Sequence, residues 1–445
     1  MQRGLKMKRM IFLLILVVTS GAFADVRKLS VDECVQIALK QSPDLIREKF
    51  TMKIAGREVI VALSSFLPSV KASMGYYHSV VGPSSAIRID PTTGIPVPLQ
   101  PLEIVSWNSS AGVNVNQTLF DGQSIFNLGR QCNLKKSAEE NYEITKQSTI
   151  YIVKERYYNL LAAEKLLEVA EETLNSSTES FKRAEALFEV GTAPKSDVLK
   201  AKVLMETDRL GLIEAQNNLA IARASLNHIL GFNVDDEIHV IDNLDVPEMD
   251  VPYEDAMASA VQYHPSLLKS AFDVKASRAQ IGMAASSFTP SVYGFYQYNW
   301  RHEDFNRISD IFDKDYNWYL GVSLQLPIFE GFSRMARLSQ ARLDYRSSQE
   351  AFNQIRRDVE LELKQSYFDV EQAKKSIAVA QNAVDASDED LRLNREKYNL
   401  GAGTMLDLID AHVSNTQTKS DYIQALYTYK KAIAALQKAM GRLDK

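Results

Sequence analysis

An internal duplication is the feature that most constrains how this chain of 445 residues can fold. Five short landmarks of the first half return in the same order in the second half, 222 residues later at first and then 209 or 210 residues later. The matching pairs are "QSPDL" (41–45) with "YHPSL" (263–267), "FLPSV" (66–70) with "FTPSV" (288–292), "LFDG" (119–122) with "IFEG" (328–331), "VGTAPKSDVL" (190–199) with "LGAGTMLDLI" (400–409), and "ILG" (229–231) with "AMG" (439–441). Self-similarity in a constant order indicates two structural repeats rather than two or three unrelated globular domains.

Each repeat reads as helix, strand, loop, strand, long helix, tight turn and helix. We place the first repeat at residues 25–230, a connection at 231–251 and the second repeat at 252–441. The expected elements are strands at about 68–80, 107–120, 290–302 and 316–329, long helices at 123–190 and 332–400, and shorter helices at 196–230 and 404–440. Ser30 and Glu33 have the spacing of a capping box, so we expect the first helix to begin there and to run to about Ser65.

The long helices exclude a compact core. Residues 123–190 contain no proline and one glycine, and residues 332–400 contain neither. At a rise of 1.5 Å per residue, a helix of 68 residues would extend ~100 Å. Helices of this length must pack side by side, so we expect antiparallel walls of coiled-coil character.

The strand segments carry two different faces. In residues 316–328, Trp318, Leu320, Val322 and Leu324 alternate with a set rich in small and polar residues. The first repeat places Val113 and Val115 among the apolar positions of a similar run, opposite asparagines and serines. A half-buried sheet of a soluble protein also alternates, and this interpretation stays open. Runs of 11–13 residues, Trp and Tyr gathered toward one end, and a face of Gly, Asn, Ser and Gln favour a transmembrane β-barrel instead.

A barrel of this kind requires more than one copy of the chain. Four strands cannot close a barrel, and an open sheet edge in lipid would leave backbone groups without hydrogen bonds. The chain must therefore oligomerise if the strands cross a membrane. The pattern alone permits two, three or four copies.

The N-terminus has the composition of a signal peptide, which we assign to residues 1–24. Four basic residues precede the apolar stretch 10–18, and Ala22 and Ala24 form a small-residue cleavage site. A membrane anchor is the alternative, but nine apolar residues are too short to cross ~30 Å of hydrocarbon as a helix. Cleavage would change the net charge from −5 to −9, which disfavours nucleic-acid binding.

The sequence offers no motif for catalysis or for a cofactor. Its six histidines are scattered, and HExxH, CxxC, GxGxxG and GxxxxGK[ST] motifs are absent. We therefore expect no enzyme activity, no metal site and no cofactor. Cys34 and Cys132 lie in separate helical segments, and we expect two separate thiols.

The order and spacing of the landmarks resemble those of the TolC-like outer membrane efflux proteins, also called outer membrane factors. The resemblance covers about residues 28–441 and is carried by the duplicated helix–hairpin–helix unit, "LFDG" after the hairpin and a "Y/F-x-x-G…D-V/L-L/I" turn in each half. It implies a homotrimer with a twelve-stranded barrel in outer-membrane lipid and a helical tunnel in the periplasm. It also implies a passive exit duct for drugs, metals or proteins, joined to a periplasmic adaptor (a membrane fusion protein) and an inner-membrane pump of the RND, ABC or MFS class.

The resemblance also assigns roles to residues at the two helix turns. The turns 191–193 and 401–403 would form the periplasmic tip and contact the adaptor through the small residues Gly191, Thr192, Ala193, Gly401, Ala402 and Gly403. The periplasmic gate would involve Asp197, Tyr398, Gly403, Asp407 and Asp410, with Gly403 at a position where relatives carry an arginine. Asp407 follows Thr404 at capping-box spacing, so it could equally serve the helix start. Asp410 lies beyond capping distance.

Two other functions stay open at this point. The chain could be a secreted or surface coiled-coil structural protein or adhesin without a membrane barrel. A periplasmic enzyme is less favoured, because the sequence shows no candidate active site.

Overall fold

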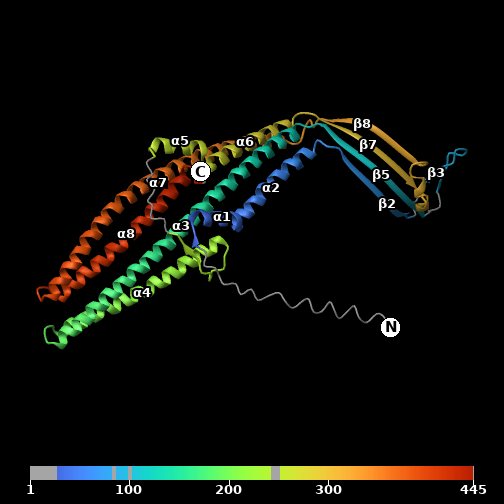
Figure 1. Cartoon of the computed structure of the whole chain (residues 1–445). Helices are drawn as coiled ribbons and strands as arrows, with labels where there is room; N and C mark the ends of the chain where they lie inside the picture. Colours follow the sequence, from blue (N-terminus) through green and yellow to red (C-terminus); the bar gives the residue numbers. More distant parts are fainter. Residues whose placement is uncertain (1–27, 83–86, 99–102, 242–250, 444–445) are drawn as a thin grey trace, which may run out of the picture. The chain divides into compact units, whose positions relative to one another are not determined.

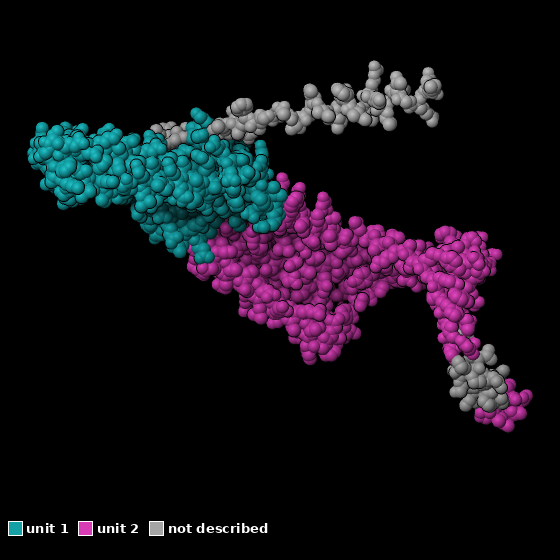
Figure 2. Space-filling model, turned by 90° about the horizontal axis from the view of Figure 1, so that it is seen from below, with its two compact units in different colours: residues 1–48, 143–264, 358–445 teal, residues 49–142, 265–357 magenta. Residues whose placement is uncertain are grey.

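The structure is a computed structural model that describes residues 28–82, 87–98, 103–241 and 251–443. The signal peptide assigned to residues 1–24 and residues 242–250 of the connection lie outside the described residues. The chain forms two compact units, coloured teal and magenta in Figure 2. Unit 1 comprises Met1–Glu48, Glu143–His264 and Asp358–Lys445, and unit 2 comprises Lys49–Tyr142 and Pro265–Arg357. Each unit therefore takes segments from both halves of the sequence.

The helices dominate both units (Figure 1). They are α1 Val31–Gln41, α2 Pro43–Ser64, α3 Gly122–Glu189, α4 Lys195–Leu230, α5 Tyr253–Tyr263, α6 Pro265–Ser286, α7 Ser333–Asn399 and α8 Met405–Ala439. The long helices α3 and α7 contain 68 and 67 residues, and each contributes to both units. Among the described residues, none of the helices combines the length and the apolar character needed to cross a membrane.

The first helix is broken, so the prediction of one helix from Ser30 to about Ser65 is wrong. Ser30 and Glu33 form the expected capping box, but α1 ends at Gln41 and α2 begins at Pro43. The intervening Ser42 has φ −57° and ψ 120°, outside the helical region. Proline disfavours helical backbone in the residue before it, which explains the break. His264, before Pro265, separates α5 from α6 in the same way, with ψ 117°.

A buried cluster in unit 1 fixes the start of the described chain. Tyr157 of α3 is 2% exposed, and its hydroxyl donates to the carbonyl of Ile241 at 2.6 Å and accepts from the Ile241 N–H at 3.1 Å. Ile241 follows β6 (His239–Val240), which pairs in parallel with β1 (Lys28–Leu29). Cys34 belongs to this cluster and is fully buried. Burial raises the pKa of its thiol to about 12, so Cys34 is an unreactive core residue.

Unit 2 contains an antiparallel sheet of four long strands, which lie side by side in Figure 1. The strands are β2 Ser69–Val81, β5 Ile104–Phe120, β7 Ser291–His302 and β8 Tyr316–Gln325, in the order β2-β5-β7-β8. Shorter elements are the hairpin of β3 Ile87–Ile89 and β4 Pro96–Pro98, and the 3-10 helix η1 Phe305–Asp310. The prediction that the last strand reaches residue 329 is wrong. β8 ends at Gln325, opposite the first residue of β7, and Pro327 has no N–H to continue the ladder.

The pairing register gives the sheet two distinct faces. Val113 pairs with Tyr298, and Tyr298 pairs with Trp318, so these three residues point to the same side. The apolar face includes Val70, Ala72, Met74, Tyr76, Trp107, Ala111, Val113, Val115, Val292, Tyr296, Tyr298, Trp300, Tyr316, Trp318, Leu320, Val322 and Leu324, with His78 and Ser109 among them. The polar face includes Lys71, Ser73, Asn108, Ser110, Asn114, Asn116, Gln297, Asn299, Asn317, Ser323 and Gln325.

Candidate functional site at the helix-hairpin tips

The two tip turns have the same backbone geometry. Gly191 follows α3 with φ 81°, and Gly401 follows α7 with φ 73°, both in the left-handed region that glycine favours. In the first turn Thr192 N donates to Leu187 O at 2.9 Å, and in the second Ala402 N donates to Lys397 O at 2.8 Å. These bonds satisfy the last carbonyls of each helix and reverse the chain. Both turns lie at the same end of unit 1 (Figure 1).

The helices restart differently after the two turns. In the second turn, one carboxylate oxygen of Asp407 accepts from Thr404 N at 3.0 Å and from Thr404 Oγ1 at 2.7 Å, and Asp407 N donates back to Thr404 Oγ1 at 3.2 Å. The expected capping box is present. These hydrogen bonds from Thr404 hold the pKa of the Asp407 carboxyl below its usual value. In the first turn the N-cap residue of α4 is Pro194, and within the described chain it makes no side-chain cap.

Asp407 and Asp410 differ in their hydrogen-bond partners. Both are exposed and lie one turn apart on α8. Asp407 is occupied by its capping bonds. Asp410 makes no hydrogen bond or ion pair within the described residues, so its carboxylate oxygens remain open to solvent. The geometry therefore separates a capping aspartate from an available one.

A small apolar cluster joins the two hairpins at their tips. Tyr398 and Met405 of the second hairpin pack with Ala184 and Ala201 of the first. Tyr398 is 7% exposed, and its hydroxyl is buried without a hydrogen-bond partner among the described residues. Burial raises the pKa of this hydroxyl, and the negative charge of the nearby Asp197 adds to the effect. Asp197 is therefore close enough to act on Tyr398 electrostatically, without a hydrogen bond between them in the described structure.

Gly403 packs tightly against the end of α7. A Cβ atom at this position would lie 3.0 Å from Lys397 Cβ and 3.3 Å from Tyr398 N. A larger residue would therefore have to displace the backbone of this turn slightly. An arginine does connect the hairpins nearby, because Arg183 Nη1 of α3 donates to Asn399 Oδ1 of α7 at 2.7 Å. Sequence reasoning missed Arg183, whose position two turns before the tip was the available signal.

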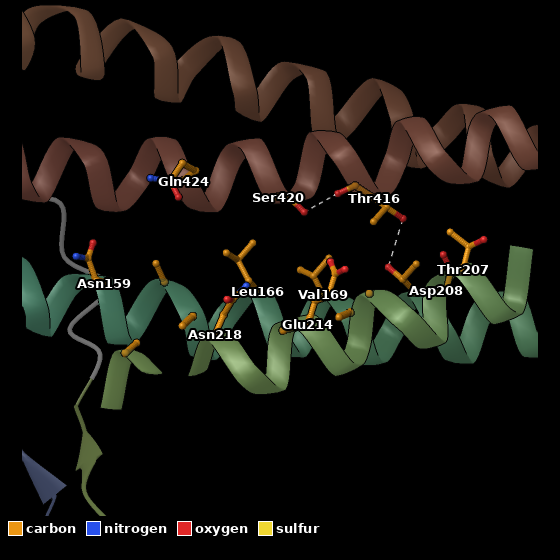
Figure 3. A pocket seen from close by; sticks show the side chains of 17 residues that line it. Asn159, Leu166, Val169, Thr207, Asp208, Glu214, Asn218, Thr416, Ser420 and Gln424 are labelled. Atoms are coloured by element: carbon orange, nitrogen blue, oxygen red, sulfur yellow. Dashed lines mark hydrogen bonds between the residues drawn. The ribbon is translucent and has the colours of Figure 1, made fainter. Parts of the chain in front are cut away.

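Polar contacts continue between the hairpins above the tips. His412 Nε2 of α8 lies 2.9 Å from Asp208 Oδ2 of α4, with the side chains 5% and 12% exposed. Thr173 and Thr416 are hydrogen-bonded at 3.3 Å. Asp208 and Thr416 also line a groove of about 540 Å³ between α3, α4 and α8, shown in Figure 3. Among the described residues, no cluster of three His, Cys, Asp or Glu side chains could hold a metal ion.

The strand residues singled out in the sequence share one face of the sheet. Trp318, Leu320, Val322 and Leu324 are 59%, 72%, 68% and 67% exposed on the apolar face. Val113 and Val115 lie on this face of β5, where they are half-buried. The structure brings these six residues together, in unit 2, while the residues predicted for the gate and for adaptor contact all lie in unit 1.

Comparison with known proteins identifies the family. The family model for outer membrane efflux proteins matches residues 34–232 and 256–442. The outer membrane protein TolC of Vibrio cholerae is 22% identical over 338 residues, which cover 75% of this chain and 77% of that protein. The outer membrane efflux protein BepC of Brucella suis is 22% identical over 408 residues, which cover 91% of this chain and 84% of that protein.

The fold agrees with solved structures of outer membrane channels. The CmeC outer membrane channel of Campylobacter jejuni matches with a TM-score of 0.80 at 18% identity, covering 93% of this chain and 87% of that one. The family model covers most of both repeats, and the resemblance inferred from the landmarks is confirmed. The chain belongs to the outer membrane efflux protein family, and its location is the outer membrane.

Proposed function

We propose that this protein is the outer-membrane exit duct of a tripartite efflux system or a type I secretion system. In this role it conducts substrates passively from the periplasm to the exterior. The observation that carries the proposal is the four-stranded sheet, which is apolar on one face and polar on the other. Lipid would contact the apolar face, and the polar face would line a water-filled lumen.

The sheet edges support an oligomer. β2 and β8 form the two edges, and within the described residues neither has a partner on its outer side. Unpaired backbone groups in hydrocarbon cost several kcal/mol each, so each edge would pair with a neighbouring copy. Three copies would give a twelve-stranded barrel. The choice of three rests on the family resemblance.

The helical hairpins would form the wall of a periplasmic tunnel. An adaptor would contact the turns at the tips, where Gly191, Thr192, Gly401 and Ala402 are exposed and Ala193 and Gly403 are half-buried. Small residues allow another backbone to approach closely. The energy for transport would come from an inner-membrane pump of the RND, ABC or MFS class.

The tip would also act as the gate. Threefold symmetry would convert Asp410 into a ring of three carboxylates, which would attract cations and hold polyvalent ones. Asp407 would contribute less, because Thr404 already occupies its carboxylate. Tyr398 and Asp197 would couple the two hairpins during opening, and Gly403 would make this tip looser than one closed by an arginine.

Cell fractionation and planar-bilayer recording test the proposal together. The protein is expected in the outer-membrane fraction, and the purified protein is expected to add stepwise ion currents without ATP. Recovery from the soluble periplasmic fraction would contradict the proposal. A secreted coiled-coil stalk or adhesin is not favoured, because the family match is to outer membrane efflux proteins.

A further inference from the structure

The connection between β7 and β8 folds back over the apolar face of the sheet. We call this segment, residues 303–315, the strap. Tyr298 donates its hydroxyl hydrogen to the carbonyl of Ile311, and the rings of Tyr298 and Phe312 lie 5.8 Å apart. At the β2 edge of the same face, the Phe305 ring lies 5.3 Å from the Tyr76 ring. Because Tyr76 and Tyr298 both belong to the apolar face, the strap crosses that face from β2 to β7.

The strap covers only one end of the apolar face. Trp300 and Ser109 are each 1% exposed, although both lie in the sheet. Toward the other end, the apolar positions from Trp318 to Ile328 stay largely uncovered, and Leu320 is 72% exposed. β8, which carries the first four of these positions, contains 10 residues, and a transmembrane strand needs about 9–11. The strap therefore lies where a membrane-spanning stretch would end.

The strap is held in place by hydrogen bonds of its own. Asp304 caps η1 by accepting from Asn306 N at 2.9 Å, and Asp304 N donates to His302 Nδ1 at 2.8 Å. Arg307 forms an ion pair with Asp310 at 2.9 Å. Phe312 is nevertheless 78% exposed, although it is part of this ordered segment. The Phe312 ring continues an exposed aromatic patch, because Tyr298 contacts both Phe312 and Tyr316, and Tyr316 is 46% exposed. A contiguous exposed apolar patch indicates a partner.

The composition of the strap indicates which partner. Charged residues surround Phe312 closely in sequence: Glu303, Asp304, Arg307, Asp310, Asp313, Lys314 and Asp315. Charges cannot enter hydrocarbon at low cost, whereas aromatic rings favour the boundary between head groups and acyl chains. A segment that presents charged side chains together with an exposed aromatic ring, beside a row of Trp and Tyr side chains, is suited to the membrane interface.

We propose that the strap is a membrane-interface anchor for the outer leaflet of the outer membrane. Phe312 contacts lipid at the head-group boundary, and the charged residues stay at head-group level. The strap thereby fixes how deeply the sheet sits in the bilayer. This inference rests on the proposed function, because it requires the apolar face to contact lipid.

Site-specific fluorescence quenching in vesicles tests the anchor. The background is the full chain with Cys132→Ser, since Cys132 is exposed and Cys34 is fully buried. An environment-sensitive thiol probe is attached separately at Phe312→Cys, at Leu320→Cys in the middle of β8, and at Thr93→Cys in the exposed turn of the β3–β4 hairpin. Because Phe312→Cys removes the anchoring ring, Asp313→Cys provides a second strap position that keeps Phe312.

The quenchers are phospholipids with a nitroxide near the head group or near the chain end, in phosphatidylethanolamine and phosphatidylglycerol vesicles. The anchor predicts several-fold stronger quenching at 312 and 313 than at 93, mainly by the shallow nitroxide. Position 320 should be quenched mainly by the deep nitroxide. If the probes at positions 312 and 313 are quenched no more than the probe at 93, while the probe at 320 is quenched, the anchor is refuted and the proposed function stands. If the probe at position 320 is also quenched no more than the probe at 93, the proposed function fails, and the anchor fails with it.

Discussion

Gly191 and Gly401 set the geometry of both tips through their backbone conformation. Both have positive φ, and within the described structure a Cβ added to either would meet no atom within 4 Å. Conformation therefore decides these positions, since space is available. Gly403 is the opposite case, because its backbone is ordinary and its surroundings are tight.

Replacing Gly401 with alanine should destabilise the tip by about 1 kcal/mol, because a non-glycine residue pays for the left-handed conformation. Gly211→Ala is the matched control. Gly211 lies inside α4 with open space around it, and alanine there should stabilise by about 0.5–1 kcal/mol. Urea unfolding followed by the helical circular dichroism signal measures both shifts. A Gly401→Ala variant as stable as the Gly211→Ala variant would contradict this account.

Asp410 is the carboxylate predicted to bind cations at the gate. Asp410→Asn should weaken the block of single-channel current by divalent cations more than Asp407→Asn does. The reason is that Asp407 is engaged by Thr404, whereas Asp410 has no partner in the described residues. Planar-bilayer recording with increasing divalent concentration measures the effect. Equal block in both variants and in the parent protein would refute the assignment.

His264 gives the break between α5 and α6 a predicted pH dependence. The side chain is buried, and burial lowers its pKa, while Glu362 opposes and Lys438 reinforces this shift. The unfolded chain therefore binds a proton at higher pH than the folded chain does. Stability should fall as pH drops below about 6.5 and through the folded pKa. His264→Gln should reduce this loss, as measured by urea midpoints at neutral and acidic pH, and an unchanged pH slope in the variant would contradict it.

At the scale of elements, alternation along the strands predicts a face-specific response to charge. Val322→Arg places a charge on the apolar face and should cost about 2–4 kcal/mol if the residue lies near the bilayer midplane. Ser323→Arg, one residue further on the polar face, should be tolerated. The yield of folded protein in the outer membrane, judged by resistance to heat in detergent, measures both. Equal yields of the two variants would argue against a lipid-facing sheet.

Sequence patterns predicted those helices and strands whose bounds depend on neighbouring residues in the chain. The starts of β2, β5, β7 and β8 lie within three residues of expectation, because alternation marks all four strands and prolines directly precede β2 and β7. The break before Pro43 contradicts the predicted single helix to about Ser65, although the proline itself was the local signal for it. The β1–β6 pair could not be predicted, since strands of two residues carry no periodicity. The strap depends on contacts such as Phe305 with Tyr76, which lie far apart in sequence.

At the candidate site, too, short-range features could be predicted and long-range contacts could not. The turns at Gly191 and Gly401 and the capping box of Thr404 with Asp407 are short-range features that residue types specify. The contacts of Arg183 with Asn399 and of His412 with Asp208 join residues 216 and 204 positions apart. One sequence cannot locate such pairs, because their partners are chosen by the packing of the hairpins.

At the scale of the whole molecule, the duplication and the structural units do not coincide. Both units draw on both repeats, so neither repeat contains a complete unit. The sheet likewise takes β2 and β5 from the first repeat and β7 and β8 from the second. The edge strands β2 and β8 of a single chain can pair only with strands of other copies, and the proposed duct depends on that assembly.

The number of chains in the complex extracted from the outer membrane is the decisive measurement for the proposed duct. Native mass spectrometry of the detergent-solubilised protein measures it. We expect three copies, which supply twelve strands and pair every β2 edge with a β8 edge of the next copy. A stable single chain in that membrane extract, with β2 and β8 still unpaired, would contradict it.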